Sequence, residues 1–222
     1  MTRSPHAPFP GRFITFEGID GSGKSTQLAA LGRALLARGL PVVTTREPGG
    51  TPVGDAIRSV VLDGAFSGMS GRAELLLYLA SRVDHVDKVI RPALLQGSLV
   101  LCDRFSEATL AYQAYGRRIP MEEVAPLVSF GACGVTPDLV VLLDLPAEEG
   151  LSRVKQRQTA NRLDREAIEF HQRVRDGYLT LAAQTPHRFK VLDARLPVDE
   201  LERAILRTVE PLCAGVASES RA

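Results

Sequence analysis

The chain has 222 residues, which is enough for one α/β domain with a sizeable buried core. Its 26 acidic and 27 basic side chains nearly cancel, so the net charge argues against a nucleic-acid-binding surface or a membrane-surface helix. The three cysteines, Cys102, Cys133 and Cys213, are odd in number and widely spaced, which favours reduced thiols over a disulfide framework or a zinc site. Because residues 1–11 lack the apolar core of a signal peptide, and no apolar run approaches the roughly 20 residues of a membrane span, we expect a cytoplasmic protein.

Short apolar runs alternate with longer stretches of helical spacing, which is typical of a parallel sheet covered by helices. The runs predict strands at Phe13–Glu17, Val42–Arg46, Leu99–Cys102, Leu139–Asp144 and Phe189–Leu192. The spacing predicts helices at Ser25–Arg38, Val53–Asp63, Arg72–Arg91 (ended by Pro92), Ser106–Tyr115, Met121–Phe130, Ala147–Arg157, Arg165–Gln184 and Val198–Val209. With no internal repeat or linker, we expect a single α/β domain over 1–222, with an ordered core of about 12–212 and flexible termini.

A phosphate-binding motif follows the first predicted strand. The segment GIDGSGKS at 18–25 matches G-x-x-x-x-G-K-[ST] at every fixed position and leads into a predicted helix. In such a P-loop the backbone N–H groups converge on phosphate oxygens, Lys24 can reach the outer phosphates, and the Ser25 hydroxyl can ligate Mg²⁺. A plain glycine-rich turn would need neither the lysine nor the hydroxyl. The residues predicted to bind a nucleoside triphosphate are Gly18, Ile19, Asp20, Gly21, Ser22, Gly23, Lys24, Ser25 and Thr26.

A carboxylate, Asp103, directly follows the third predicted strand, at the edge where parallel sheets bind their ligands. Together with Ser25 it predicts a Mg²⁺ site. The alternative is that Asp103 caps the helix that follows, because aspartate is common at helix N-termini. The P-loop alone does not distinguish a kinase from a GTPase or an ATPase.

Three further stretches lie where a second phosphate-bearing substrate would need contacts. They are TREPGGT at 45–51, LYLASR at 77–82, and DRF at 103–105 followed by Thr109, Tyr112, Gln113, Gly116 and Arg117. Taken singly, each stretch has a simpler interpretation. The first is an ordinary loop, the second a core tyrosine with a surface arginine, and the third a set of packing and surface residues. Together with the P-loop, they resemble the thymidylate kinase family over nearly the whole chain.

The resemblance implies the P-loop nucleoside monophosphate kinase fold, a five-stranded parallel sheet flanked by helices with a short lid at 153–165. It also implies ATP-dependent phosphorylation of thymidine 5′-monophosphate (dTMP) to the diphosphate, in dTTP synthesis for DNA replication. The implied substrates are dTMP and ATP, with Mg²⁺, and the implied assembly is a homodimer. We expect no nucleic-acid or membrane partner.

The resemblance also implies roles for individual acceptor-side residues. A cis Glu47–Pro48 bond shapes the thymidine pocket; Tyr78, where the family usually has Phe, stacks on thymine; and Arg82 bonds the base. Thr109 and Gln113 lie at the base, while Tyr112 blocks the space of a ribose 2′-hydroxyl. Arg58 and Arg104 contact the monophosphate. The implied substrate-binding residues are therefore Glu47, Pro48, Arg58, Tyr78, Arg82, Arg104, Thr109, Tyr112 and Gln113.

The basic segment at 153–165 resembles the lid of the family. Some members have an arginine inside the P-loop, where this chain has Gly21, so the cation on the transferring phosphoryl group must come from elsewhere, and Arg153, Arg157 and Arg162 are the obvious sources. The alternative is a solvated basic helix surface. The implied catalytic residues are Lys24, Arg104, Asp20 (at the sugar 3′-hydroxyl or a magnesium water), Arg153, Arg157 and Arg162, and the role of Glu17 stays open.

Two other functions stay open at this point. The first is a kinase for another nucleoside monophosphate or for a deoxynucleoside, against which only the acceptor-side residues argue. The second is a P-loop GTPase switch, because NRLD at 161–164 faintly matches N-K-x-D, although it lacks the lysine and follows a basic helix.

Overall fold

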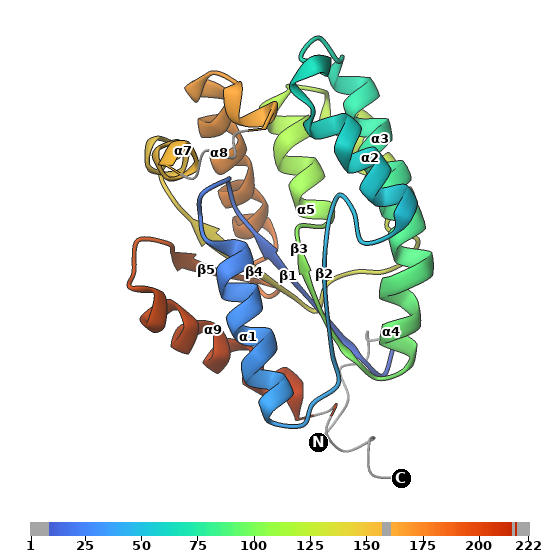
Figure 1. The fold of residues 1–222 in the computed structure, drawn as a ribbon, viewed down its shortest axis with the longest axis vertical. Coiled ribbons are helices and arrows are strands. Elements are labelled where there is room, and N and C mark those ends of the chain that lie inside the picture. The colour runs from blue at the N-terminus through green and yellow to red at the C-terminus, as the bar shows by residue number, and fades with distance from the viewer. Residues whose placement is uncertain (1–8, 157–160, 215, 217–222) are drawn as a thin grey trace.

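The structure is a computed structural model that describes residues 9–156, 161–214 and 216. Five parallel strands form one sheet in the order β2-β3-β1-β4-β5 (Figure 1). The strands are β1 (Arg12–Glu17), β2 (Val42–Arg46), β3 (Leu99–Asp103), β4 (Leu139–Asp144) and β5 (Phe189–Asp193). The predicted five-stranded parallel sheet is therefore confirmed, with β3 running one residue further than predicted, to Asp103.

Helices cover both faces of the sheet because the strand side chains on each face are apolar. Ile14 and Phe16 of β1 point to one face, where they belong to a core with α1 (Lys24–Ala37) and α9 (Val198–Cys213). These two helices contact each other on that side of the sheet (Figure 1). Phe13 and Val100 point to the other face and belong to a second core cluster.

The remaining helices form the other face and the upper rim of the molecule in Figure 1. They are α2 (Pro52–Leu62), α3 (Gly71–His85), α4 (Arg91–Leu95), α5 (Ser106–Thr109), α6 (Met121–Gly131), α7 (Ala147–Gln156) and α8 (Ile168–Gln184). Single turns connect some of them: the 3₁₀ turns η1 (Gly64–Phe66) and η4 (Leu163–Arg165), and the π turns η2 (Val86–Ile90) and η3 (Leu110–Gly116). Side-chain caps fix the start of two helices, since Thr51 Oγ1 accepts from the Gly54 N–H and Ser70 Oγ from the Ala73 N–H.

Three predicted helix boundaries are wrong. The last helix, α9, does not end at Val209 but continues to Cys213, because Val209 and Cys213 lie four positions apart and both pack into the core. Pro92 does not end the long third helix, because the chain stays helical from α3 through the π turn η2 into α4 and ends at Leu95. A proline lacks the N–H donor and crowds the carbonyl four residues before it, and the wider π turn directly before Pro92 accommodates both effects. The predicted start of α8 at Arg165 is three residues early, because Arg165 ends the tight 3₁₀ turn η4 and α8 begins at Ile168.

The topology places the loops after β1, β2 and β3 at one edge of the sheet. After β1 the chain crosses to β2, whereas after β3 it crosses to β4 on the opposite side of β1, so a crevice opens at the carboxyl ends of β1 and β3. In the part of the chain that the structure describes, no helix has the length and apolar character to cross a membrane.

Candidate functional site

The P-loop lies between the end of β1 and the first turn of α1. Gly23, with φ of 93°, takes the left-handed conformation that a residue with a side chain rarely adopts, and it forms the N-terminal end of α1. The Lys24 ammonium donates to the carbonyl oxygens of Gly18 at 3.1 Å and Ile19 at 2.9 Å, so it folds back over its own loop. Burial, together with the nearby positive charge of Arg104, lowers the pKa of Lys24 to about 8.

Gly21 is closely packed against α7. A Cβ atom there would lie 2.3 Å from the Gly150 carbonyl oxygen, and the φ of +81° is itself unfavourable for a side chain. An arginine at this P-loop position would therefore displace α7. Arg153 follows Gly150 on the same helix, and its guanidinium lies 3.5 Å from the Gly21 carbonyl oxygen and 3.2 Å from that of Ala194. The structure thus places Arg153, one of the predicted lid arginines, next to a P-loop that has no arginine of its own.

Ser25 and Asp103 meet across the crevice. The Ser25 hydroxyl donates to Asp103 Oδ2 at 2.6 Å, although the two residues are 78 positions apart in the sequence. The alternative role of Asp103 as a helix cap is not seen, since α5 begins without a side-chain capping bond. A hydroxyl and a carboxylate are both hard oxygen donors of the kind that Mg²⁺ prefers. Within the described residues there is no group of three or more His, Cys, Asp or Glu side chains that could hold a metal ion.

Two cavities adjoin each other at this edge of the sheet. The first is an open-sided cavity of about 540 Å³, within the range of small-ligand sites, and all nine predicted acceptor-binding residues line it. The second lies over the P-loop and is walled by Gly21, Lys24, Ser25, Thr26 and Asp103. Four side chains line both cavities: Asp20, Glu47, Arg58 and Arg104.

Arg104 stands at the boundary between the two cavities. Its guanidinium donates to Asp20 Oδ1 at 2.8 Å and to the hydroxyl of Tyr112 at 3.1 Å, and it lies over the Tyr112 ring. Its backbone φ of 74° is left-handed, which aims the side chain back toward the P-loop. Although burial opposes ionisation of Asp20, the charges of Arg104 and Lys24 hold the pKa of this carboxyl well below its usual range.

Arg58 is the second arginine at this boundary. It extends from α2 and donates to the Pro48 carbonyl oxygen at 3.0 Å. Burial, and next the charge of Arg46, lower the pKa of its guanidinium, which still stays a cation at neutral pH. Arg58 and Arg104 therefore offer positive charge to the same space.

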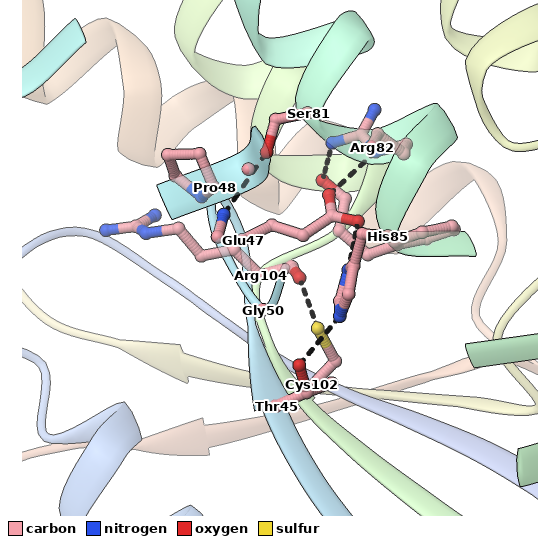
Figure 2. Close-up of polar contacts among 12 residues, drawn as sticks. Thr45, Glu47, Pro48, Gly50, Ser81, Arg82, His85, Cys102 and Arg104 are labelled. Atoms are coloured by element: carbon pink, nitrogen blue, oxygen red, sulfur yellow. Dashed lines mark hydrogen bonds and ion pairs between the residues drawn. The ribbon is translucent and has the colours of Figure 1, made fainter. Parts of the chain in front are cut away.

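A buried ion pair between Glu47 and Arg82 (Figure 2) belongs to the lining of the first cavity. Glu47 Oε2 accepts from Arg82 Nε at 2.7 Å, and Glu47 Oε1 lies 3.0 Å from His85 Nδ1. His85 Nε2 in turn lies 2.7 Å from Thr45 Oγ1. The cis Glu47–Pro48 bond implied by the resemblance is present. The Glu47 side chain points toward Arg82 and His85 of α3 (Figure 2).

The base-contacting candidates lie around Arg82. Its Nη2 donates to Thr109 Oγ1 at 2.9 Å and to the Phe105 carbonyl oxygen at 2.8 Å, which leaves Nη1 as a buried donor without a partner among the described residues. Tyr78 lies half-buried on α3, in the wall of the cavity. Gln113 is buried, and its Nε2 donates to Glu74 Oε1 at 2.8 Å.

The three predicted lid arginines have different surroundings. Arg153 lies beside the P-loop, as described above. Arg162 is 3% exposed and points away from it, donating to the Val61 carbonyl oxygen at 3.0 Å and to the Glu74 carboxylate. Arg157 lies outside the described residues. The catalytic roles of Arg157 and Arg162 stay predictions.

Asn161 and Asp164 of the NRLD segment form hydrogen bonds within the segment itself, and Asn161 also lines the first cavity. Asn161 Oδ1 accepts from the Leu163 N–H at 2.8 Å, and Asp164 Oδ2 accepts from the Asn161 N–H at 2.8 Å. Both side chains therefore hold a local turn, the usual behaviour of such residues in loops. Burial, and then the charge of Asp20, raise the pKa of Asp164 to about 6. The GTPase alternative therefore loses the support of this segment and keeps only that of the P-loop, which a kinase would share.

Two buried carboxylates support the site: Glu17, whose role the sequence left open, and Glu74, which sequence reasoning missed. Glu17 accepts from the Phe105 N–H at 2.7 Å and from the Tyr178 hydroxyl at 2.8 Å, and burial, with the nearby Glu107, raises its pKa to about 8. Glu74 joins residues that lie 39 to 88 positions away in the chain. The one available signal was an acidic residue on the apolar face of a predicted helix or strand, which indicates burial but names no partner.

Comparison with known proteins agrees with this arrangement. The family model described as thymidylate kinase matches residues 16–205. A thymidylate kinase of Trichlorobacter lovleyi is 51% identical over 199 residues, covering 87% of this chain and 94% of the relative. A thymidylate kinase of Pelotomaculum thermopropionicum is 47% identical over 214 residues, covering 96% and 99% of the two chains.

Among solved structures, the crystal structure of thymidylate kinase from Ehrlichia chaffeensis superimposes with a TM-score of 0.74 at 33% identity, and the match covers 90% of this chain and 98% of that one. Similarity in sequence therefore extends to the fold over almost the full length of both proteins. The chain belongs to the thymidylate kinase family.

Proposed function

We propose that the cavity lined by Tyr78, Arg82 and Gln113 binds dTMP and that the P-loop cavity binds ATP, so that the chain phosphorylates dTMP to dTDP. The single observation that carries this assignment is that the two cavities share Arg58 and Arg104. A phosphate in either cavity would be held beside the same cations. Direct transfer needs this proximity, because the reacting oxygen must approach the phosphorus of the other nucleotide closely.

The acceptor needs little activation. The second pKa of a phosphate monoester is about 6, so its attacking oxygen is already mostly ionised at neutral pH. We therefore assign no general base to Asp20, which is paired with Arg104 and takes the role of a ligand for the sugar hydroxyl or a bound water. Catalysis then consists mainly of positioning and charge neutralisation, to which Lys24, Arg58 and Arg104 contribute.

Ser25 and Asp103 fit a Mg²⁺ ion by their chemistry. Both are oxygen donors, they lie 2.6 Å apart, and they open onto the P-loop cavity. When bound, the ion would offset negative charge on the phosphates. The chain's own part is to hold these two oxygens in place on the first turn of α1 and at the end of β3.

Arg153 is the lid cation that we assign to the transferring phosphoryl group. Gly21 leaves the P-loop without its own arginine, and Arg153 is the described lid arginine whose guanidinium lies beside this loop. In this conformation it donates to carbonyl oxygens, so it must turn toward the phosphates when the donor binds. The lid assignment at 153–165 is part of the same proposal.

The proposed base selectivity rests on the shape of the acceptor cavity. Tyr78 supplies a ring for stacking on thymine, and Tyr112 is held between Arg104 and Asp20 by its hydroxyl, which donates to Asp20 Oδ2 at 2.8 Å. Its ring is therefore fixed where a ribose 2′-hydroxyl would otherwise enter. A ribonucleotide acceptor should bind less well for this reason.

Steady-state assays of the purified chain test the assignment. ADP formation from ATP should be fastest with dTMP, slower with dUMP, which lacks only the base methyl group, and much slower with dCMP, dGMP or ribonucleotides. A missing methyl costs about 1–3 kcal/mol, so dUMP should remain a measurable substrate. Preference for any acceptor other than dTMP would overturn the proposal.

A homodimer in the cytoplasm completes the proposal. Phe130 of α6 is 76% exposed and Leu76 of the neighbouring helix α3 is 58% exposed, which is a large apolar exposure for two adjacent helices. The three cysteines are free thiols, as expected in a reducing compartment. Light scattering should give a dimer mass for the wild type and a monomer mass for Phe130→Asp, and a monomeric wild type would contradict the dimer.

A further inference from the structure

Glu74 of α3 is a buried charge that none of the proposed chemical steps uses. It is 0% exposed, and its two carboxylate oxygens accept hydrogen bonds from three different residues. Oε1 accepts from Gln113 Nε2 at 2.8 Å and Arg117 Nε at 3.1 Å, and Oε2 accepts from Arg117 Nη2 at 3.0 Å and from Arg162 Nη2. A carboxylate has about four such acceptor positions, so those of Glu74 are filled.

The charge state of Glu74 follows from these partners. Although burial opposes ionisation, the hydrogen bonds from Arg117, Arg162 and Gln113 keep the pKa of Glu74 below its usual value. Glu74 is therefore an ionised carboxylate at neutral pH, which accepts hydrogen bonds and cannot donate them.

An acceptor-only neighbour decides which end of the Gln113 amide faces which way. The two ends of an amide are nearly identical in shape, so hydrogen bonding has to select between them. Beside an ionised Glu74, only the NH₂ group of Gln113 can face the carboxylate. The amide oxygen is then the end presented to the acceptor cavity that Gln113 lines, and it accepts no hydrogen bond from the described residues.

With the Gln113 amide fixed in this way, the cavity offers one hydrogen-bond donor, from Arg82, and one acceptor, from Gln113. Arg82 and Gln113 both line this cavity. Arg82 Nη1 is a buried donor without a partner among the described residues, and none of these residues donates a hydrogen bond to the Gln113 amide oxygen. Thymine and uracil present a carbonyl oxygen at position 4 and an N–H at position 3, which match a donor and an acceptor. Cytosine presents an amino group and a bare ring nitrogen at these positions, so both contacts would be mismatched.

We propose that Glu74 is a positioning residue for base selection: by fixing the Gln113 amide with its oxygen toward the cavity, it makes the site accept 4-oxo pyrimidines and reject cytosine. The inference rests on the proposed placement of the base in this cavity. Glu74 itself does not touch the substrate.

The variant Glu74→Gln tests the proposal, because a neutral amide of similar size can either donate or accept and no longer fixes Gln113. The ratio of kcat/KM for dTMP to kcat/KM for dCMP should fall about tenfold, which corresponds to roughly one hydrogen bond of 1.4 kcal/mol. The fall should come mainly from a higher KM for dTMP, while the KM for ATP stays within about twofold, since one contact at the base is altered. An unchanged ratio in a folded variant would overturn the inference.

Glu166→Gln is the matched control. Glu166 also accepts from Arg117, at 2.7 Å, but no contact joins it to Gln113 among the described residues. Its loss should lower the melting temperature without moving the dTMP-to-dCMP ratio. An equal fall in the ratio would mean that any weakening of the Arg117 network has this effect, which contradicts a specific role for Glu74.

A double-mutant cycle with Gln113→Leu separates positioning from general loosening. If Glu74 acts through Gln113, then Glu74→Gln should change the ratio in the wild-type background and have no further effect in the Gln113→Leu background. Additive effects would overturn the proposed route. If wild-type protein failed to phosphorylate dTMP at all, the proposed function would fail instead, so the two failures are distinguishable.

Side-chain NMR of the wild-type protein covers the case in which Glu74→Gln does not fold. The ¹⁵N-labelled amide of Gln113, assigned by comparison with Gln113→Leu, should keep a hydrogen-bonded NH₂ group in the free protein and with dTMP bound. An NH₂ resonance that changes on dTMP binding as a donor to the base would show the opposite orientation and overturn the inference.

Discussion

The guanidinium of Arg104 lies 2.8 Å from the carboxylate of Asp20 and joins the acceptor cavity to the P-loop. Arg104 also donates to the Gly18 carbonyl oxygen at 3.0 Å. Two residues of the P-loop, Gly18 and Asp20, therefore hold its guanidinium in place. The loop that we propose binds ATP therefore positions a cation at the cavity that we propose binds dTMP.

Arg104→Ala should raise the KM for dTMP much more than the KM for ATP. Hydrogen bonds to charged groups contribute about 1.5–3 kcal/mol each, so we expect an increase of at least about tenfold for dTMP. Arg72→Ala, which removes an exposed arginine paired with Glu123, is the control and should leave both constants unchanged. A change confined to ATP would show that Arg104 serves the donor and that the acceptor site is wrongly placed.

ATP affinity should depend on the charge of Lys24. In the free protein its pKa is about 8, and a bound triphosphate must raise it. Affinity is therefore complete below pH 8 and falls as the pH rises through 8, by at most tenfold per unit for one proton. Calorimetric titration with ATP between pH 6.5 and 9.5 would measure this slope.

Two variants separate Lys24 from its neighbour Glu17, whose pKa is also about 8. Lys24→Met should bind ATP weakly at all pH values and lose turnover, with the fold intact by circular dichroism. Glu17→Gln should keep a falling affinity above pH 8, because Lys24 still titrates. If the fall in ATP affinity above pH 8 survived in Lys24→Met but disappeared in Glu17→Gln, the titrating residue would be Glu17, which would contradict the prediction for Lys24.

The pair Ser25–Asp103 should determine the Mg²⁺ requirement. Asp103→Asn keeps the shape but removes the charge, so the Mg²⁺ concentration for half-maximal activity should rise about tenfold or more, as for loss of one charged ligand. Ser25→Ala should shift it in the same direction. Activity of both variants with an unshifted Mg²⁺ dependence would place the ion elsewhere.

The buried pair Glu47–Arg82 should contribute strongly to stability. Both side chains are almost completely buried, and Glu47→Ala would leave Arg82 as an uncompensated charge at a cost of about 3–5 kcal/mol. Urea denaturation should show this loss. The exposed pair Arg72–Glu123 is the comparison, and Glu123→Ala should cost no more than about 1 kcal/mol. An equal loss of unfolding free energy in the two variants would contradict a strong contribution of the buried pair to stability.

The fold and the P-loop could be predicted because both depend on local patterns. Apolar runs of strand length separated by helical spacing led to the five parallel strands, and the motif at 18–25 lies where a strand passes into a helix. The boundary at Pro92 could not be predicted, because the π turn that accommodates this proline leaves no distinct pattern in the sequence.

The supporting contacts of the site could not be predicted either. Nothing near Glu74 in the sequence indicates that Gln113 and Arg162 bind the same carboxylate, since only the packed fold brings these residues together. The same holds for Gly21, whose lack of a side chain is explained by the approach of Gly150 and not by its own surroundings in the sequence.

Displacement by a bisubstrate compound is the measurement that tests the adjoining sites most directly. In this compound a polyphosphate chain joins the 5′ positions of adenosine and thymidine, so one molecule can occupy both cavities at once. We predict that at equilibrium it displaces both bound ATP and bound dTMP, each measured alone, with an affinity above that of either nucleotide. Displacement of only one of the two nucleotides, or an affinity no higher than that of the nucleotide it displaces, would contradict two adjoining sites that share Arg58 and Arg104.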